Sequence, residues 1–219
     1  DDVITLFHEF GHGIHHLLSL VEEPSVTGIS GVPWDAVELP SQFLENWCWE
    51  RDALDLLTSH VDTGEALPDK LLQKLRGARN FQSGMQMVRQ LEFALFDFRL
   101  HASTTLISAD AILRVLDDVR QQVAVVTPPS FDRFPHAFSH IFAGGYAAGY
   151  YGYLWSEVLS ADAYDRFEQE GVFNATAGRA FMQHVLETGG VEEPLDVFKA
   201  FRGREPSINA FLRHSGLNT

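Results

Sequence analysis

Apolar residues recur at every third or fourth position along most of this 219-residue chain. Between residues 83 and 126 the pattern twice follows i, i+3 or i+4, and i+7, which is the spacing that lines one face of an α-helix. The sequence therefore predicts a mainly α, multi-helical fold. The expected helices cover residues 3–21, 40–60, 68–79, 83–101, 109–126, 147–170, 175–188, 193–201 and 206–215.

Two short segments depart from the helical pattern. Residues 25–35, SVTGISGVPWD, place β-branched residues between glycines and a proline, which favours a short extended or β segment near residues 25–37, or an irregular loop. The segment VTPPS (126–130) contains two consecutive prolines, which stop a helix. Neither segment is a long polar linker and the sequence shows no internal repeat, so we expect one domain over residues 1–219.

The charge balance bears on the partners of the chain. Sixteen Lys and Arg residues against 30 Asp and Glu residues give a formal net charge of −14. Such a surface repels phosphate backbones and anionic lipids, so we expect no nucleic acid and no membrane among the partners.

The sequence has no run of about 18 apolar residues and no secretory leader pattern. The single Cys48 cannot form a disulfide within the chain, which favours a reducing, cytoplasmic location.

The segment LFHEFGHGIHHLL (6–18) has the pattern of a metal-binding helix. His8 and His12 lie one turn apart and about 40° apart around the axis, so both imidazoles can reach one ion. Glu9 would lie beside that ion, where its carboxylate can take a proton from metal-bound water. Zinc lowers the pKa of such a water to about 7, so the pattern predicts zinc-dependent amide hydrolysis with Glu9 as general base.

A catalytic zinc needs three protein ligands, so a third must come from elsewhere. The metzincin pattern HExxHxxGxxH fails, because His15 and Leu18 stand where it needs Gly and His. Glu38 and Glu45 are the best candidates: they lie two helical turns apart, so Glu38 could bind zinc while Glu45 orients a ligating histidine. His15 either extends the site or packs in the core. The other acidic candidates are Glu22, Glu23 and Asp35.

A second cluster lies in HIFAGGYAAGYYGYLW (140–155). Tyr146, Tyr150 and Tyr153 follow i, i+4 and i+7, so we expect them on one helical face. Such a stripe is either packing surface or, together with His140, a set of donors for the oxyanion that forms during peptide-bond hydrolysis. The adjacent pair of glycines would let a peptide substrate approach the backbone closely; these are Gly144 and Gly145.

Four segments together resemble the thimet oligopeptidase and oligopeptidase A family of zinc metallopeptidases: HEFGHGIHH, WDAVELPSQFLENWCWE, HIFAGGYAAGYYGYLW and FRGREPSINAFL. The resemblance extends nearly from one end of the chain to the other and implies a zincin-type metallopeptidase catalytic domain. By position, it makes His8, His12 and Glu38 similar to the zinc ligands, Glu9 to the catalytic base and Glu45 to the acid behind the ligands. It also makes four positions similar to the family's substrate-binding and oxyanion-stabilising groups: His140, Tyr146, Tyr150 and Tyr153.

The resemblance further implies cytoplasmic cleavage of short peptides with one Zn²⁺ per chain. Family members are much longer, so residues 1–219 look like the C-terminal catalytic part of a peptidase whose N-terminal half is missing. We therefore expect the chain to hydrolyse peptides weakly on its own and to self-associate through exposed apolar surface. Two alternatives stay open: a non-catalytic zinc-binding helical fragment, and another helical metallopeptidase with terminal specificity.

Overall fold

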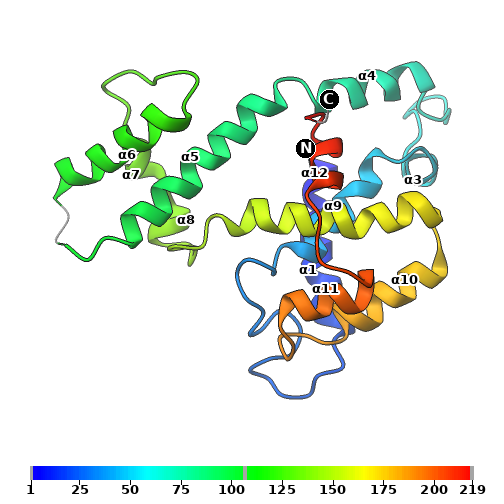
Figure 1. Ribbon diagram of the computed structural model, residues 1–219. Helices are drawn as coiled ribbons and strands as arrows, with labels where there is room; N and C mark the ends of the chain where they lie inside the picture. Colours follow the sequence, from blue (N-terminus) through cyan, green and yellow to red (C-terminus); the bar gives the residue numbers. More distant parts are fainter. Residues whose placement is uncertain (1, 106–107, 218–219) are drawn as a thin grey trace. The chain divides into compact units, whose positions relative to one another are not determined.

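The computed structural model describes residues 2–105 and 108–217, and in these ranges it contains helices and no strand (Figure 1). The mainly α prediction is therefore confirmed. The chain forms two compact units: the first comprises the described residues up to Phe81 and from Ser156 onward, and the second is Gln82–Trp155. That the two units act as one catalytic domain stays a prediction. Among the described helices, none has the length and apolar character needed to cross a membrane.

The first unit is organised around α1 (Asp2–Leu18) packed against α2 (Leu39–Glu45). Its aromatic core holds α2 in place, and Phe43 of α2 stacks on Phe181 with ring centroids 3.9 Å apart. The remaining helices of this unit are the 3-10 helix η1 (Asn46–Trp49), α3 (Arg51–Leu57), α4 (Asp69–Arg79), most of α9 (Gly152–Glu170), α10 (Ala175–Phe181), the π-helix η2 (Met182–Leu186), α11 (Pro194–Arg202) and α12 (Asn209–His214).

The predicted helix over 40–60 is divided into α2, η1 and α3. Glu50 has extended backbone angles (φ −91°, ψ 132°), which ends η1 before α3 begins. Upstream, the Asn46 side-chain amide donates to the carbonyl of Phe43 at 3.0 Å, and the Trp47 indole donates to the carbonyl of Val172 at 3.0 Å. The Asn46 contact is local and the Trp47 contact reaches a distant part of the chain. Both hold the chain in η1, between α2 and α3, and the spacing of apolar residues gives no sign of them.

The second unit pairs α5 (Ser83–His101) with α6 (Ala109–Val123), followed by the short helices α7 (Phe134–Ala137) and α8 (Ser139–Phe142). The Ser108 hydroxyl accepts a hydrogen bond from the backbone N–H of Ala111 and caps the start of α6. α6 ends ahead of the two prolines, before the expected residue 126. The sequence did not predict α7 and α8, because four residues are too few to display a helical period.

The segment at 25–37 forms consecutive turns rather than paired strands, so the irregular loop is the correct alternative. Gly28 and Gly31 have φ of 58° and 73°, a region that glycine enters without steric cost. The carbonyl of Val26 accepts from the backbone N–H of Gly190 at 2.8 Å. Backbone groups of this segment form hydrogen bonds within turns and with Gly190, whereas a strand would need a neighbouring strand along its length.

Candidate metal centre

The helix α1 carries both histidines of HEFGH on one side. The rings of His8 and His12 lie edge to face with centroids 5.0 Å apart, as the one-turn spacing predicts. Both side chains are half-buried, and Glu9 between them is exposed. The local geometry therefore agrees with two imidazoles turned to a common point and an adjacent carboxylate open to solvent.

The third candidate ligand arrives from α2, because Glu38 precedes the first residue of that helix. Its Oε2 lies 3.3 Å from Nε2 of His8 and 3.2 Å from Nε2 of His12, and one ligand atom from each of the three side chains lies within 4.8 Å of the others. Glu38 is 4% exposed. The Ser41 hydroxyl donates to Oε2 at 3.0 Å, which fixes the carboxylate. The three side chains form the one such group found among the described residues.

Glu45 lies on the far side of His8. Its Oε1 is 2.7 Å from Nδ1 of His8, so Nδ1 donates to Glu45 while Nε2 faces Glu38. These two carboxylates raise the pKa of His8 to about 10, with the contact to Glu38 the larger cause. The raised pKa means that His8 carries a proton on Nε2 as well as on Nδ1 near neutral pH, and a cation bound at Nε2 would have to displace the Nε2 proton. The seven-residue spacing predicted that one glutamate would face the ion and the other a ligating histidine, and both carboxylates lie at His8.

Gly11 explains how α1 and α2 come close enough to share the site. A Cβ at position 11 would lie 2.5 Å from Cα of Ser41 and 2.7 Å from the carbonyl oxygen of Pro40. Because these atoms are backbone, they cannot rotate away. Only glycine permits this approach, so Gly11 of HEFGH allows Glu38 to reach the two histidines.

His15 packs in the core of the first unit and does not join the three-residue group. It is 3% exposed, and neither ring nitrogen has a hydrogen-bond partner among the described residues. It lines a small cavity of about 30 Å³ with Ala36, Leu39 and Val197. Burial, with a smaller effect from His12, lowers the pKa of His15 to about 4, so the ring is neutral near pH 7.

The tyrosine cluster of the second unit forms differently from the prediction. α9 begins at Gly152, so Tyr146 and Tyr150 lie in turns before the helix and the predicted common helical face is wrong. The rings nevertheless meet: Tyr146 stacks on Tyr153 at 4.7 Å, and Tyr150 lies 5.2 Å from Tyr153. His140 is within 6.4 Å of all three rings. The turn thus groups side chains that the sequence analysis expected a helix to group.

The two glycines of this segment lie at the surface. A Cβ at Gly144 would lie 2.9 Å from Cα and from the carbonyl oxygen of His140, and Gly145 has φ of 87°. Both positions therefore need glycine for the local chain path. Their expected role in binding a peptide stays a prediction.

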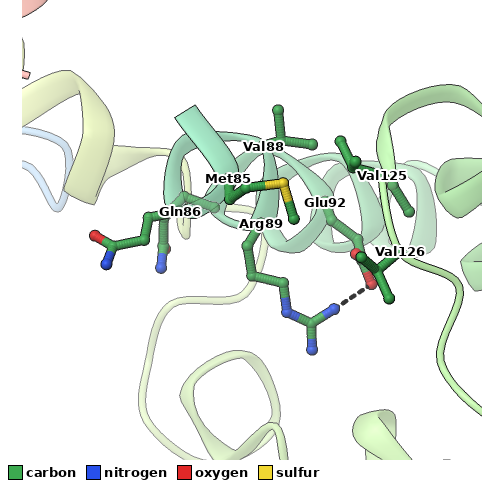
Figure 2. A pocket seen from close by; sticks show the side chains of 9 residues that line it. Met85, Gln86, Val88, Arg89, Glu92, Val125 and Val126 are labelled. Carbon is green, nitrogen blue, oxygen red and sulfur yellow. Dashed lines mark hydrogen bonds and ion pairs between the residues drawn. The ribbon is translucent and has the colours of Figure 1, made fainter. Parts of the chain in front are cut away.

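A cavity of about 370 Å³ in the second unit had no sequence signal. It lies beside α5, and Figure 2 shows Arg89 donating to Glu92 at its edge. Gln90 also lines this cavity, and its Oε1 accepts the hydrogen bond of the Tyr150 hydroxyl at 3.0 Å. Burial is the largest cause that raises the pKa of Tyr150 to about 12, so its phenol stays protonated near neutral pH.

Comparison with known proteins identifies the family. The sequence profile of Peptidase family M3 matches residues 1–217. Oligopeptidase A of Salmonella typhimurium is 60% identical over 217 residues, 99% of this chain and 32% of that protein. Probable cytosolic oligopeptidase A of Arabidopsis thaliana is 49% identical over 220 residues, 99% of this chain and 31% of that protein. Dipeptidyl carboxypeptidase of Escherichia coli is 36% identical over 223 residues, 100% of this chain and 32% of that protein.

The chain thus spans about a third of the length of these relatives. The family profile, in contrast, covers nearly all of the chain, including HEFGH, both glutamates at His8 and the tyrosine segment. The chain belongs to Peptidase family M3.

Proposed function

We propose that this chain is the catalytic part of a zinc metalloendopeptidase that cleaves short peptides. The observation that carries the proposal is the convergence of His8 and His12 on one oxygen of Glu38, at 3.3 and 3.2 Å. Two imidazoles and one carboxylate are a ligand set that catalytic zinc uses, with a further position left for water or substrate. The family and the oligopeptidase A relatives support the same reaction class.

The donor set fits zinc, with His8, His12 and Glu38 as the residues that would hold it. Their ligand atoms already lie within 4.8 Å of one another, and Ser41 and Glu45 orient two of the three side chains. When bound, zinc supplies a Lewis acid that polarises a carbonyl and makes water acidic enough to ionise near neutral pH.

The side chains of this chain would supply the proton transfers and hydrogen bonds of the reaction. Glu9, exposed beside the histidines, would take the proton of the attacking water and pass it to the leaving amine. Tyr150, Tyr153 and His140 would donate hydrogen bonds to the oxyanion, and Tyr146, Gly144 and Gly145 would contact the peptide. To donate to the oxyanion, the Tyr150 hydroxyl would have to give up the hydrogen bond that it donates to Oε1 of Gln90.

The ligand set is tested by measuring zinc on the purified chain. Glu38→Ala should lose stoichiometric zinc, because one of three ligands is removed. Glu45→Gln should keep zinc but bind it about 10–100-fold more weakly, since it only orients His8. Metal content after gel filtration and competition with a chelator give both numbers. Glu22→Ala, at an exposed position in the following loop, is the control and should bind zinc like the unmodified chain. Full zinc occupancy in Glu38→Ala would refute the ligand assignment.

A second candidate function is release of dipeptides from peptide ends, which the similarity to dipeptidyl carboxypeptidase supports. Mass spectrometry of products from a peptide about ten residues long separates internal cleavage from stepwise dipeptide release. A non-catalytic zinc-binding fragment is the remaining alternative, and it would bind zinc and yield no product at all.

We also propose that this chain works as part of a longer enzyme, since it matches about a third of its relatives. The rest of that enzyme would confine the peptide, so the separate chain should hydrolyse peptides poorly. A side-by-side assay with a full-length relative tests this, and equal rates would contradict it. We place the enzyme in the cytosol, where the single Cys48 needs no partner, and cell fractionation checks that location.

The exposed face of α1 also supports the proposal that this chain is part of a longer enzyme. Val3, Leu6, Phe10 and Leu17 recur along one side of the helix and are 52%, 65%, 57% and 75% exposed. A row of exposed apolar side chains of this kind is typical of a surface that another polypeptide covers. We infer that the remainder of the longer enzyme covers it, and that the separate chain self-associates through it.

Lysines on this face should abolish the self-association. In Leu6→Lys/Leu17→Lys the chain should become monomeric, because the new charges oppose contact between apolar faces. Light scattering over a range of concentrations measures the change. The control is Val61→Lys, which adds a lysine at another highly exposed apolar position and should leave the association unchanged. A monomeric unmodified chain would refute the inference.

A further inference from the structure

The turn that carries Tyr146 and Tyr150 has an unusual backbone. Ala148, between the two tyrosines, has φ of 56°, in the left-handed region that residues other than glycine seldom occupy. Such a conformation persists when surrounding groups hold it. The groups that hold it therefore decide where the tyrosine rings lie.

A buried carboxylate on α5 holds this turn. Asp97 is fully buried, and its Oδ1 accepts from the backbone N–H of Ala148 at 2.9 Å. Its Oδ2 accepts from the backbone N–H of Tyr150, also at 2.9 Å. Hydrogen bonds to an ionised acceptor are stronger than those between neutral groups, so one side chain fixes both amides of the turn.

His101, one turn later on α5, completes the arrangement. Its Nδ1 lies 2.7 Å from Oδ1 of Asp97, and its side chain is 28% exposed. The acid therefore has three donors within 2.9 Å, of which two belong to the tyrosine turn and one to its own helix. The helix α5 thereby serves as the rigid support of the turn.

We propose that Asp97, with His101 as its partner, is the positioning residue of the tyrosine cluster. Asp97 has no solvent exposure and so acts through the turn rather than on a substrate. By holding the amides on both sides of Gly149, it fixes the ring of Tyr150 between Tyr153 and the Gln90 amide. Its importance for hydrolysis rests on the proposed function, whereas its hold on the turn does not.

The experiment uses the tyrosines as their own probe, because four of the five in the chain lie in this segment. Tyr150 has a pKa of about 12, against an ordinary value of 10.0. In a stopped-flow jump to about pH 11, a phenol of ordinary pKa ionises within the dead time and Tyr150 stays protonated. Asp97→Asn can accept only one of the two amides, so Tyr150 should be released. About one additional tyrosine per chain should then ionise in the fast phase.

The controls distinguish loss of the hold on the tyrosine turn from the general effect of removing a buried carboxylate. Asp162→Asn removes an equally buried carboxylate, which bonds Arg204 and the backbone of Ser207 in the first unit, and should leave tyrosine ionisation unchanged. Adding Ala148→Gly to Asp97→Asn should restore part of the protection, because glycine adopts the left-handed turn without help. If Asp97→Asn does not fold, Asp97→Glu gives the same test, since the longer side chain cannot hold both amides.

Unchanged tyrosine ionisation in a folded Asp97 variant would overturn the proposal. Peptide hydrolysis measured in parallel tests the proposed function separately. If the unmodified chain shows no hydrolysis while the Asp97 variant changes tyrosine ionisation, the positioning role stands and the proposed function fails. If the positioning role and the proposed function are both correct, Asp97→Asn should lower kcat about tenfold or more, and Asp162→Asn should not.

Discussion

Glu9→Gln should abolish peptide hydrolysis while leaving zinc bound. The amide has the size of the carboxylate but cannot take a proton, and a general base contributes about 10²–10⁴-fold to a rate. Glu9 is exposed and lies outside the His8, His12 and Glu38 group, so its replacement should change neither the metal content nor the fold. The rate is measured with an internally quenched peptide at high protein concentration, and bound zinc is determined on the same samples.

Glu23→Gln is the matched control, an exposed glutamate beyond the end of α1, and it should retain the full rate. Hydrolysis by Glu9→Gln at the unmodified rate would exclude Glu9 as the base. Loss of zinc together with activity would instead show that Glu9 helps to hold the metal.

Gly11→Ala should weaken both the fold and the metal site. The new Cβ would overlap backbone atoms of Ser41 and Pro40 and force α1 away from α2, which we expect to cost about 1–3 kcal/mol of unfolding free energy. Because Glu38 moves with α2, zinc affinity should fall as well. Urea unfolding and zinc competition measure the two effects.

Gly13→Ala provides a control of opposite sign on the same helix. A Cβ at that position meets only the Phe10 side chain, at 4.0 Å. Alanine is the better helix former, so this variant should gain roughly 0.5–1 kcal/mol and keep its zinc affinity. A Gly11→Ala variant as stable as the parent would show that the two helices can separate without loss.

The sequence was sufficient for the parts of the site that depend on a single helix. The positions of His8, His12 and Glu9 follow from the 3.6-residue period, and the seven-residue spacing of Glu38 and Glu45 predicted one glutamate at the ion and the other at a ligating histidine. The reason for Gly11 was not visible, because the backbone it approaches comes from another helix, about 30 residues later in the chain.

The tyrosine segment shows where the sequence-based prediction failed. A spacing of i, i+4 and i+7 is compatible with a helix, yet Asp97, about 50 residues earlier in the chain, takes the amides of Ala148 and Tyr150. Those amides would otherwise have joined helical hydrogen bonds. The buried acid in ALFDFRLH gives no local sign of this contact, so only the tertiary structure explains why α9 begins at Gly152.

The two arginines of the segment FRGREPSINAFL have a structural role that the sequence did not reveal. Arg202 and Arg204 both bond the buried carboxylate of Asp162, at 3.1 and 2.7 Å, and so serve the fold rather than a ligand.

The three proposed ligand side chains are divided between α1 and the start of α2, which has a consequence for how the protein unfolds. A cation held by both helices acts as a cross-link between residues about 30 positions apart, and its binding energy becomes part of the energy of folding. Chelators should therefore act on this protein as mild denaturants, and the lifetime of the folded chain should depend on how much free metal surrounds it.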